Sequence, residues 1–160
     1  MSVIIVAGPT CSGKTTFIKN NFPNHTVVDL FDFQKDIVFA SYENIMQSYI
    51  ECRDALVAAL KRGEDVVLEH TLLKAMRREM YINAIRSVTD APVEMYFLMP
   101  SDEQLFKQMK ERKYPGSIAT AQQMKQIAEI PTTSEGYAVV HVISDDPAIA
   151  REERDSGAAR

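Results

Sequence analysis

The chain has 160 residues, of which 46% are hydrophobic and 25% are charged, and its formal net charge is −4. This length suits one domain and suffices to bury a core without disulfides or a structural metal. No apolar stretch approaches the roughly 20 residues that cross a bilayer, and no signal-peptide pattern follows Met1, so we expect no membrane segment and a cytoplasmic protein. The acidic charge argues against nonspecific coating of nucleic acid, and no obligate protein partner is expected.

Short apolar runs alternate with helix-like segments along the chain. A short continuous apolar run predicts a strand that is buried on both faces, and apolar residues that recur every three or four positions predict a helix. Such alternation predicts an α/β fold of three layers around a mainly parallel five-stranded sheet. The expected strands are Val3–Ala7, His25–Leu30, Asp65–Glu69, Val93–Met99 and Tyr137–Ile143, and the expected helices begin near Lys14, Ser41, Lys74, Ser101 and Thr120.

The ends of the expected domain are less regular. Residues 1–146 carry the whole strand and helix pattern, and residues 147–160 are charged, so we expect them to form a loose tail. The only cysteines are Cys11 and Cys52, and Cys11 lies inside a glycine-containing loop. Both are therefore expected to be free thiols, as in a reducing compartment.

Residues 8–16 read GPTCSGKTT and connect the first expected strand to the first expected helix. They match GxxxxGK(S/T), in which backbone N–H groups and a helix N-terminus converge on an anion. The lysine of this motif reaches the β and γ phosphates, and the hydroxyl after it binds Mg²⁺. The sequence thus predicts ATP and Mg²⁺ as cofactors, Thr15 as the metal ligand and Lys14 as a catalytic residue. The expected nucleotide-binding residues are Gly8, Cys11, Ser12, Gly13, Lys14, Thr15 and Thr16.

Two acids near the end of the second expected strand are candidates for binding and activating a phosphate acceptor. The sequence has no NKxD motif for reading guanine, so a small kinase is favoured over a switch GTPase. Ligands of open α/β sheets collect at such strand ends. We prefer Asp32 as general base because it lies just past the strand, while Asp29 could remain in the strand or cap the turn. Either acid could instead only cap a helix that begins near Gln34.

Several segments resemble the kinase domain of polynucleotide kinases and their P-loop relatives, which include zeta-toxin-like, gluconate and chloramphenicol kinases. These segments are GPTCSGKTT, VVLEHTLLKAMRR, VEMYFLMPSDEQLFKQMKER and PTTSEGY, and the resemblance covers roughly residues 3 to 143. It implies ATP-dependent transfer of the γ-phosphoryl group to a hydroxyl. The favoured acceptor is a nucleic acid, either at a 5′-hydroxyl end or at a hydroxymethylated base such as 5-hydroxymethyluracil in DNA.

The resemblance also implies roles for single residues. In the family a strand ends in Asp and Thr, with an Arg six residues later, and Thr71 and Arg77 keep this spacing as implied substrate-binding residues. Glu69 lies one position before the family's acid and His70 replaces it, so neither receives a role. The family's lid helix follows a Pro and ends in an Arg that reaches ATP. Arg112 takes that place, and the lid would span about residues 101–128.

Each of these residues also has a plain structural alternative. An arginine on a mobile segment can neutralise the transferring phosphoryl group, and 114–116 (YPG) would bound such a segment, but Arg112 could also simply favour a helix C-terminus. Arg77 could lie on a solvated helix face. His70 could be a hydrogen-bonded core histidine, which we rank above any catalytic role.

Two groups of side chains bear on the acceptor. A run of bases could meet phosphate or only solvate a helix face, and three aromatic residues could stack on a base or pack in the core. The bases are Lys107, Lys110, Arg112 and Lys113, and the aromatic residues are Phe31, Phe33 and Tyr42. A small-molecule kinase for a nucleoside, nucleotide sugar or other alcohol is therefore the second hypothesis, and a nucleotide-gated binding module is the third.

Overall fold

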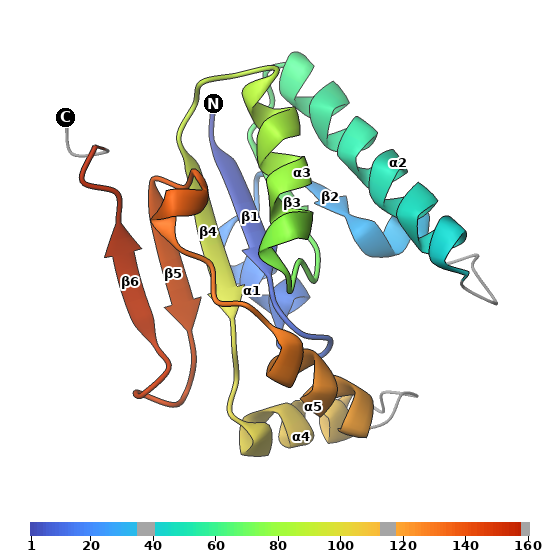
Figure 1. The fold of residues 1–160 in the computed structure, drawn as a ribbon, viewed down its shortest axis with the longest axis vertical. Helices are drawn as coiled ribbons and strands as arrows, with labels where there is room; N and C mark the ends of the chain where they lie inside the picture. Colours follow the sequence, from blue (N-terminus) through green and yellow to red (C-terminus); the bar gives the residue numbers. More distant parts are fainter. Residues whose placement is uncertain (35–40, 113–117, 158–160) are drawn as a thin grey trace.

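The computed structural model describes residues 1–34, 41–112 and 118–157. Its centre is a six-stranded sheet in the order β2-β3-β1-β4-β5-β6 (Figure 1). The first five strands in sequence pair in parallel, and the sixth runs antiparallel to β5 at the edge. The strands are β1 (Val3–Ala7), β2 (Thr26–Asp29), β3 (Val66–Glu69), β4 (Val93–Leu98), β5 (Val139–Ile143) and β6 (Arg151–Arg154).

Helices cover both faces of this sheet and one of its ends. In Figure 1 α2 and α3 lie on the near face, α1 lies behind the sheet, and α4 and α5 lie beyond the carboxyl ends of the parallel strands. Short 3-10 helices follow β2 and precede β5. The helices are α1 (Lys14–Asn21), η1 (Leu30–Phe33), α2 (Tyr42–Lys61), α3 (Ala75–Arg86), α4 (Asp102–Glu111), α5 (Ile118–Ile127) and η2 (Thr133–Glu135).

The core lies on the two faces of the sheet. Residues of α2 and α3 such as Leu56 and Ile85 pack with Ile5 and Leu68 on one face. On the other face Ile18 of α1 packs with alternate residues of the same central strands. Helices cover both faces of the central parallel strands, which explains why the sequences of these strands are continuous apolar runs. None of the helices in the described part of the chain is long and apolar enough to cross a membrane.

The structure confirms the expected α/β fold with a mainly parallel central sheet, and it corrects details. The sheet has a sixth strand, because Arg151–Arg154 pairs with β5 where a loose tail was expected. The residues of this strand, REER, carry no apolar signal, since an exposed edge strand can be charged throughout. Helix α5 begins at Ile118 and not at Thr120. The turn after β2 is η1, which ends just before Gln34.

Candidate active site at the phosphate loop

The loop between β1 and α1 is held tightly by its neighbours. Gly8 and Gly13 have φ values of +144° and +96°, a region that side chains rarely adopt. A Cβ atom at Gly8 would lie 2.4 Å from the carbonyl oxygen of Leu98, so this position requires glycine. The Gly8 N–H donates to the carbonyl of Thr71 at 3.0 Å. The loop is therefore fixed between the end of β4 and the segment that follows β3.

Lys14 curls back over this loop. Its Nζ donates to the carbonyl oxygens of Gly8 and Pro9, each at 2.9 Å. Burial lowers the pKa of Lys14 to about 8, although the charge of Glu69 opposes the shift. Among the residues that the structure describes, no group pairs with the buried hydroxyl of Ser12. A partly buried cation beside an unpaired hydroxyl, at a helix N-terminus, suits an anion such as a nucleotide phosphate.

Two carboxylates stand beside the loop. Asp29 and Glu69 are register partners at the ends of β2 and β3, and their side chains share a hydrogen bond. The Thr15 hydroxyl donates to Glu69 Oε1 at 2.7 Å. Burial, followed by the hydrogen bond with Asp29, raises the pKa of Glu69 to about 7. The raised pKa means that the Glu69 carboxyl holds its proton more tightly than an exposed glutamate does.

This set of oxygen atoms fits Mg²⁺. The described residues contain no group of three or more His, Cys, Asp or Glu side chains that could cage a metal. Mg²⁺ in phosphate-transfer sites uses one or two carboxylates, with substrate phosphates and water completing the octahedron. Thr15 and Glu69 could supply two of these ligands, directly or through water. Sequence reasoning gave Glu69 no role, although its place at the end of the strand beside β1 was a usable signal.

A cavity of about 310 Å³ opens in front of the loop. Asp29 borders it, whereas the exposed Asp32 borders a neighbouring hollow that Asp29 and Glu69 also reach. The Asp29 side chain caps η1 by accepting from the Phe31 N–H at 3.0 Å. Of the two candidate bases, the structure thus brings Asp29 into the cavity. Its lining residues are Thr10, Cys11, Ser12, Gly13, Lys14, Thr15, Asp29, Leu30, Phe31, Gln34, Glu69, His70, Thr71 and Arg112.

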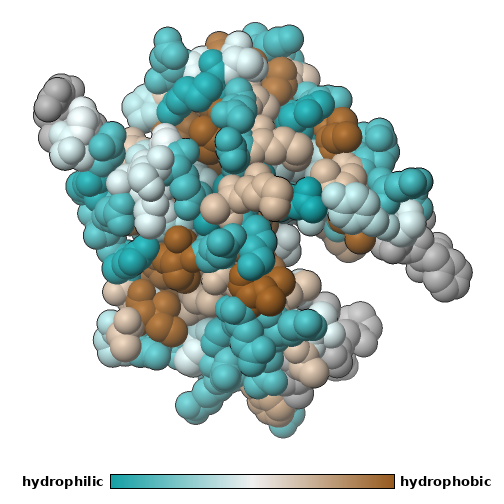
Figure 2. Space-filling model, in the orientation of Figure 1, coloured by the Kyte–Doolittle hydropathy of each residue, from teal (hydrophilic) through white to brown (hydrophobic). Residues whose placement is uncertain are grey.

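A second cavity of about 320 Å³ adjoins the first and shares four lining residues with it. Figure 2 shows the surface hollowed between the part of the molecule that contains α2 and the part that contains α4 and α5. The described residues that line this second cavity are all uncharged. They are Thr10, Leu30, Gln34, Ile45, Tyr49, Thr71 and Met124. The two cavities form one cleft with a charged phosphate end and an uncharged end.

Thr71 and Arg77 were expected together at a substrate site, but only Thr71 lines the cleft. Thr71 lines both cavities, as expected for a substrate-binding residue. Arg77 lines neither of them. Its guanidinium lies 5.8 Å from the centre of the Tyr49 ring, and its Nη1 lies 3.0 Å from Met46 Sδ. Arg77 thus supports Tyr49, which faces the uncharged cavity.

His70 is a buried structural residue, as the preferred interpretation had it. The Leu72 N–H donates to Nδ1 at 3.2 Å, so the ring proton resides on Nε2 and points at the Tyr81 hydroxyl, 3.0 Å away. Tyr81 in turn donates to the carbonyl of Tyr49 at 3.0 Å. Burial lowers the pKa of His70 to about 3. The imidazole is therefore neutral and fixes the segment after β3.

Arg112 reaches the phosphate loop from the position immediately after α4. It caps the C-terminus of α4, lines the first cavity, and donates from Nη2 to the Thr16 hydroxyl at 3.3 Å. Helices α4 and α5 pack on the loop through Cys11, whose φ is +63°. The residues of this small apolar cluster are Cys11, Leu105, Met109 and Ala121. Arg112 thus lies beside the phosphate loop, and its contact with a nucleotide stays a prediction.

The other candidates for acceptor binding divide into four groups. Phe31 borders the first cavity and is 65% exposed, and Tyr42 is 68% exposed, so both are free to stack. Phe33 packs against the core. Lys107 borders a hollow next to Arg112. Lys113 and residues 114–116 lie outside the described residues.

A mainly parallel sheet in this strand order, with a GxxxxGK(S/T) loop between β1 and α1, defines the fold of a P-loop protein. The chain belongs to the AAA_33 family of AAA domains, whose model matches residues 3–137. Among curated proteins, no match to the sequence is found.

Three solved structures show how far this fold is shared. A gluconokinase from Sinorhizobium meliloti superposes with a TM-score of 0.67 at 16% identity, over 91% of this chain and 84% of that one. A sugar kinase from Janibacter sp. HTCC2649 gives 0.64 at 17% identity, over 90% and 85%. A chain of the Pnkp1/Rnl/Hen1 RNA repair complex gives 0.66 at 15% identity, over 79% of this chain but 43% of that one. At these identities the likeness establishes the fold.

Proposed function

We propose that the protein is an ATP-dependent kinase that transfers the γ-phosphoryl group to a hydroxyl. The observation that carries the proposal is the single cleft, in which a phosphate loop and a carboxylate pair meet an uncharged cavity. This arrangement places a phosphate donor and an alcohol side by side, which is the main requirement of phosphoryl transfer.

The charged residues take separate parts in this reaction. Lys14 and Arg112 neutralise the phosphoryl group, and Thr15 with Glu69 would hold Mg²⁺, which would offset the phosphate charge. The acceptor oxygen forms a bond to the γ phosphorus, while the bond from that phosphorus to the β,γ-bridging oxygen breaks and ADP leaves. The acceptor proton passes to a carboxylate, for which we propose Asp29.

Asp29 replaces Asp32 as our first choice because it borders the cavity that holds the phosphate loop. Asp32 borders the neighbouring hollow and is exposed. Asp29 caps the N-terminus of η1 and Asp32 lies within it, three residues later, so a substrate that approached through that hollow would favour Asp32 instead. The matched substitutions described in the Discussion separate these assignments.

The acceptor that we put first is a hydroxyl of a nucleic acid, either a 5′ end or a hydroxymethylated base. The exposed Phe31, which borders the first cavity, supports this choice, since aromatic side chains stack on bases whatever their sequence. The likeness to a chain of an RNA repair complex agrees with it. The second candidate is a small alcohol, which the size and uncharged lining of the second cavity favour, in line with the likeness to a gluconokinase and a sugar kinase.

The test is transfer of labelled γ-phosphate from Mg·ATP to a panel of acceptors. The panel contains 5′-hydroxyl DNA and RNA, duplex DNA with 5-hydroxymethyluracil, free nucleosides and simple sugars, with Lys14→Ala as control. Label in an oligonucleotide supports the first candidate, and nuclease digestion then shows whether the phosphate is on an end or a base. Label only in small alcohols supports the second. ATP binding without transfer to any of them contradicts the kinase proposal and favours a nucleotide-gated module.

A further inference from the structure

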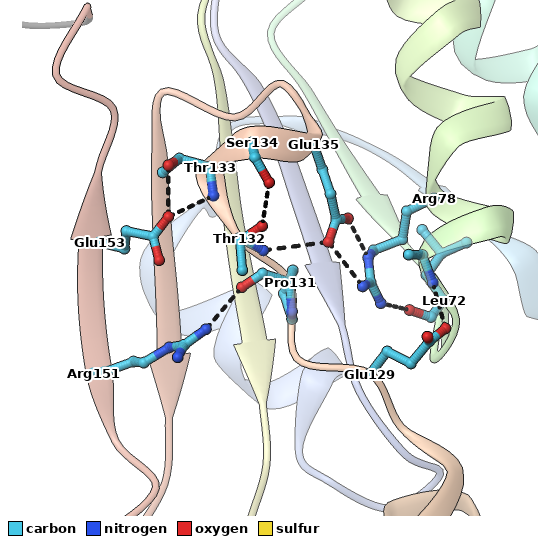
Figure 3. A network of polar contacts seen from close by, with 11 residues as sticks. Leu72, Arg78, Glu129, Pro131, Thr132, Thr133, Ser134, Glu135, Arg151 and Glu153 are labelled. Carbon is cyan, nitrogen blue, oxygen red and sulfur yellow. Dashed lines mark hydrogen bonds and ion pairs between the residues drawn. The ribbon is translucent and has the colours of Figure 1, made fainter.

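An ion pair with a fully buried arginine lies away from the cleft. The Arg78 side chain, from α3, has 0% exposure. It donates two hydrogen bonds to the Glu135 carboxylate, from Nε at 2.6 Å and from Nη2 at 3.0 Å (Figure 3). Replacing such a pair with apolar residues is often neutral or stabilising, so its presence is weak evidence for a role in stability alone. A role in fixing geometry is the better explanation.

The third hydrogen bond of Arg78 leads toward the phosphate loop. Its Nη1 donates to the Leu72 carbonyl at 2.8 Å. Leu72 has a φ of +40°, which costs free energy for a residue with a branched side chain and persists only where the surroundings enforce it. The residue before it, Thr71, supplies the carbonyl that accepts from the Gly8 N–H. Arg78 thus holds the segment whose Thr71 carbonyl accepts the hydrogen bond from Gly8, the first glycine of the loop.

The other partner, Glu135, is itself held in place. Its Oε2 accepts from the Thr132 N–H at 3.3 Å, within the capping box of η2. Two residues of β6 hold the same stretch: Glu153 accepts from the Thr133 N–H at 2.8 Å, and Arg151 donates to the Pro131 carbonyl at 3.1 Å (Figure 3). The edge strand that the sequence did not predict therefore braces the ion pair.

The same stretch is also the return path of the chain from α5. The Glu129 N–H donates to the Leu73 carbonyl at 2.7 Å, and the Glu129 carboxylate accepts from the Ala75 N–H at 3.1 Å. The segment after β3 is thus bound on one side by Gly8 of the phosphate loop and on the other by residues 129–135. The segment after β3 therefore links the phosphate loop to the chain that leaves α5, and α5 packs with α4, the helix that Arg112 follows.

We propose that Arg78 and Glu135 are positioning residues for nucleotide binding. They hold Thr71 and Leu72 in the conformation that anchors the Gly8 N–H, and β6 braces them from the far side. The proposal needs nucleotide binding at the phosphate loop but no transfer to any acceptor. Its failure is therefore distinguishable from failure of the proposed kinase activity.

The first test compares Glu135→Gln with a control in the same core. Gln keeps the shape of Glu135 but loses the charge that pairs with Arg78, whereas Ile85→Ala opens a cavity on α3 at a fully buried position. We expect the dissociation constant for ATP, measured by calorimetry, to rise about tenfold in Glu135→Gln, the usual scale of coupling within one polar network. Ile85→Ala should bind ATP as the wild type does, at a temperature where both variants are folded.

A local measurement separates positioning from general loss of stability. In Glu135→Gln the Gly8 amide should exchange its hydrogen faster than in Ile85→Ala when the two are compared at the same distance below their melting temperatures. Equal exchange and unchanged ATP binding in Glu135→Gln would overturn the proposal. So would an equal loss of ATP binding in Ile85→Ala.

A milder pair of variants covers the case in which Glu135→Gln does not fold. Glu153→Gln removes the charge with which β6 holds Thr133, and it leaves no buried charge unpaired. We expect a roughly threefold rise in the ATP dissociation constant, since the brace acts through one further step. Arg154→Ala is the matched control, because Arg154 lies on the same strand and pairs with Glu152. Identical ATP binding in these two variants would contradict the proposed brace.

Discussion

The two ends of the cleft are built in opposite ways. The phosphate end concentrates charge: Lys14, Arg112, Asp29 and Glu69 border one cavity, and the loop beneath it is a contiguous stretch of sequence. The described lining of the other end carries no charge and comes from η1, α2, α5, the phosphate loop and the segment after β3. The chemistry of phosphate binding is thus set by local sequence, whereas the shape that selects an acceptor depends on how distant elements pack.

Loss of Lys14 should have the largest effect and should be confined to the phosphate end. Lys14→Ala removes the cation nearest the phosphates, so we expect transfer to fall by about a thousandfold or more. Binding of the acceptor, measured by calorimetry without ATP, should stay unchanged because Lys14 does not line the uncharged cavity. A variant that kept more than a tenth of wild-type turnover would show that phosphate binding does not depend on this loop.

The matched pair Asp29→Asn and Asp32→Asn tests which of the two acids serves as general base between the two ends of the cleft. We expect Asp29→Asn to lower kcat about a hundredfold with little change in the KM for ATP, the usual scale for loss of a general base. Asp32→Asn should stay within about threefold of the wild type. Steady-state kinetics on both variants decides the matter, and the reverse pattern would return the role of base to Asp32.

The contrast between the two ends also explains what the sequence could predict. The five parallel strands and the phosphate loop follow from apolar runs and a contiguous motif, both of which are local signals. Strand β6 was missed because an edge strand needs no apolar face. Glu69 received no role because it lies one position before the family's acid, and its contacts became visible only when parallel pairing placed it beside Asp29, with Thr15 donating to it. Arg77 keeps the expected spacing, yet only packing shows that it stands behind Tyr49.

Glu69 makes the phosphate end sensitive to pH. Its pKa of about 7 lies above the usual 4.5, so the folded protein binds the proton more tightly than the unfolded chain does. In the free protein the stability contributed by this group is therefore greatest at low pH and declines as pH rises from about 4.5 to 7. Glu69→Gln should flatten that part of the profile, which spans a difference in Tm of up to about 10 °C in the wild type.

Binding of Mg·ATP should show the opposite dependence, since a metal requires the ionised carboxylate. We expect the affinity of the wild type for Mg·ATP to rise between pH 6 and 8 more steeply than that of Glu69→Gln, by about tenfold at pH 8. Calorimetry should be carried out on both proteins over the same pH range. The protonation of ATP contributes equally to the two profiles, so their difference reports on Glu69. Parallel profiles would mean that Glu69 does not take part in metal binding.

The smallest effect is expected at the uncharged end, where Tyr49 faces the cavity with Arg77 behind its ring. Tyr49→Leu keeps an apolar side chain but removes the flat surface, so the KM for the acceptor should rise about fivefold, as for loss of a stacking contact. The KM for ATP should stay constant, because Tyr49 lies outside the phosphate end. Tyr49→Phe keeps the ring and is the control that should match the wild type. If Tyr49→Leu raised both KM values equally, the two ends would not be separable, and the second cavity would belong to the nucleotide site.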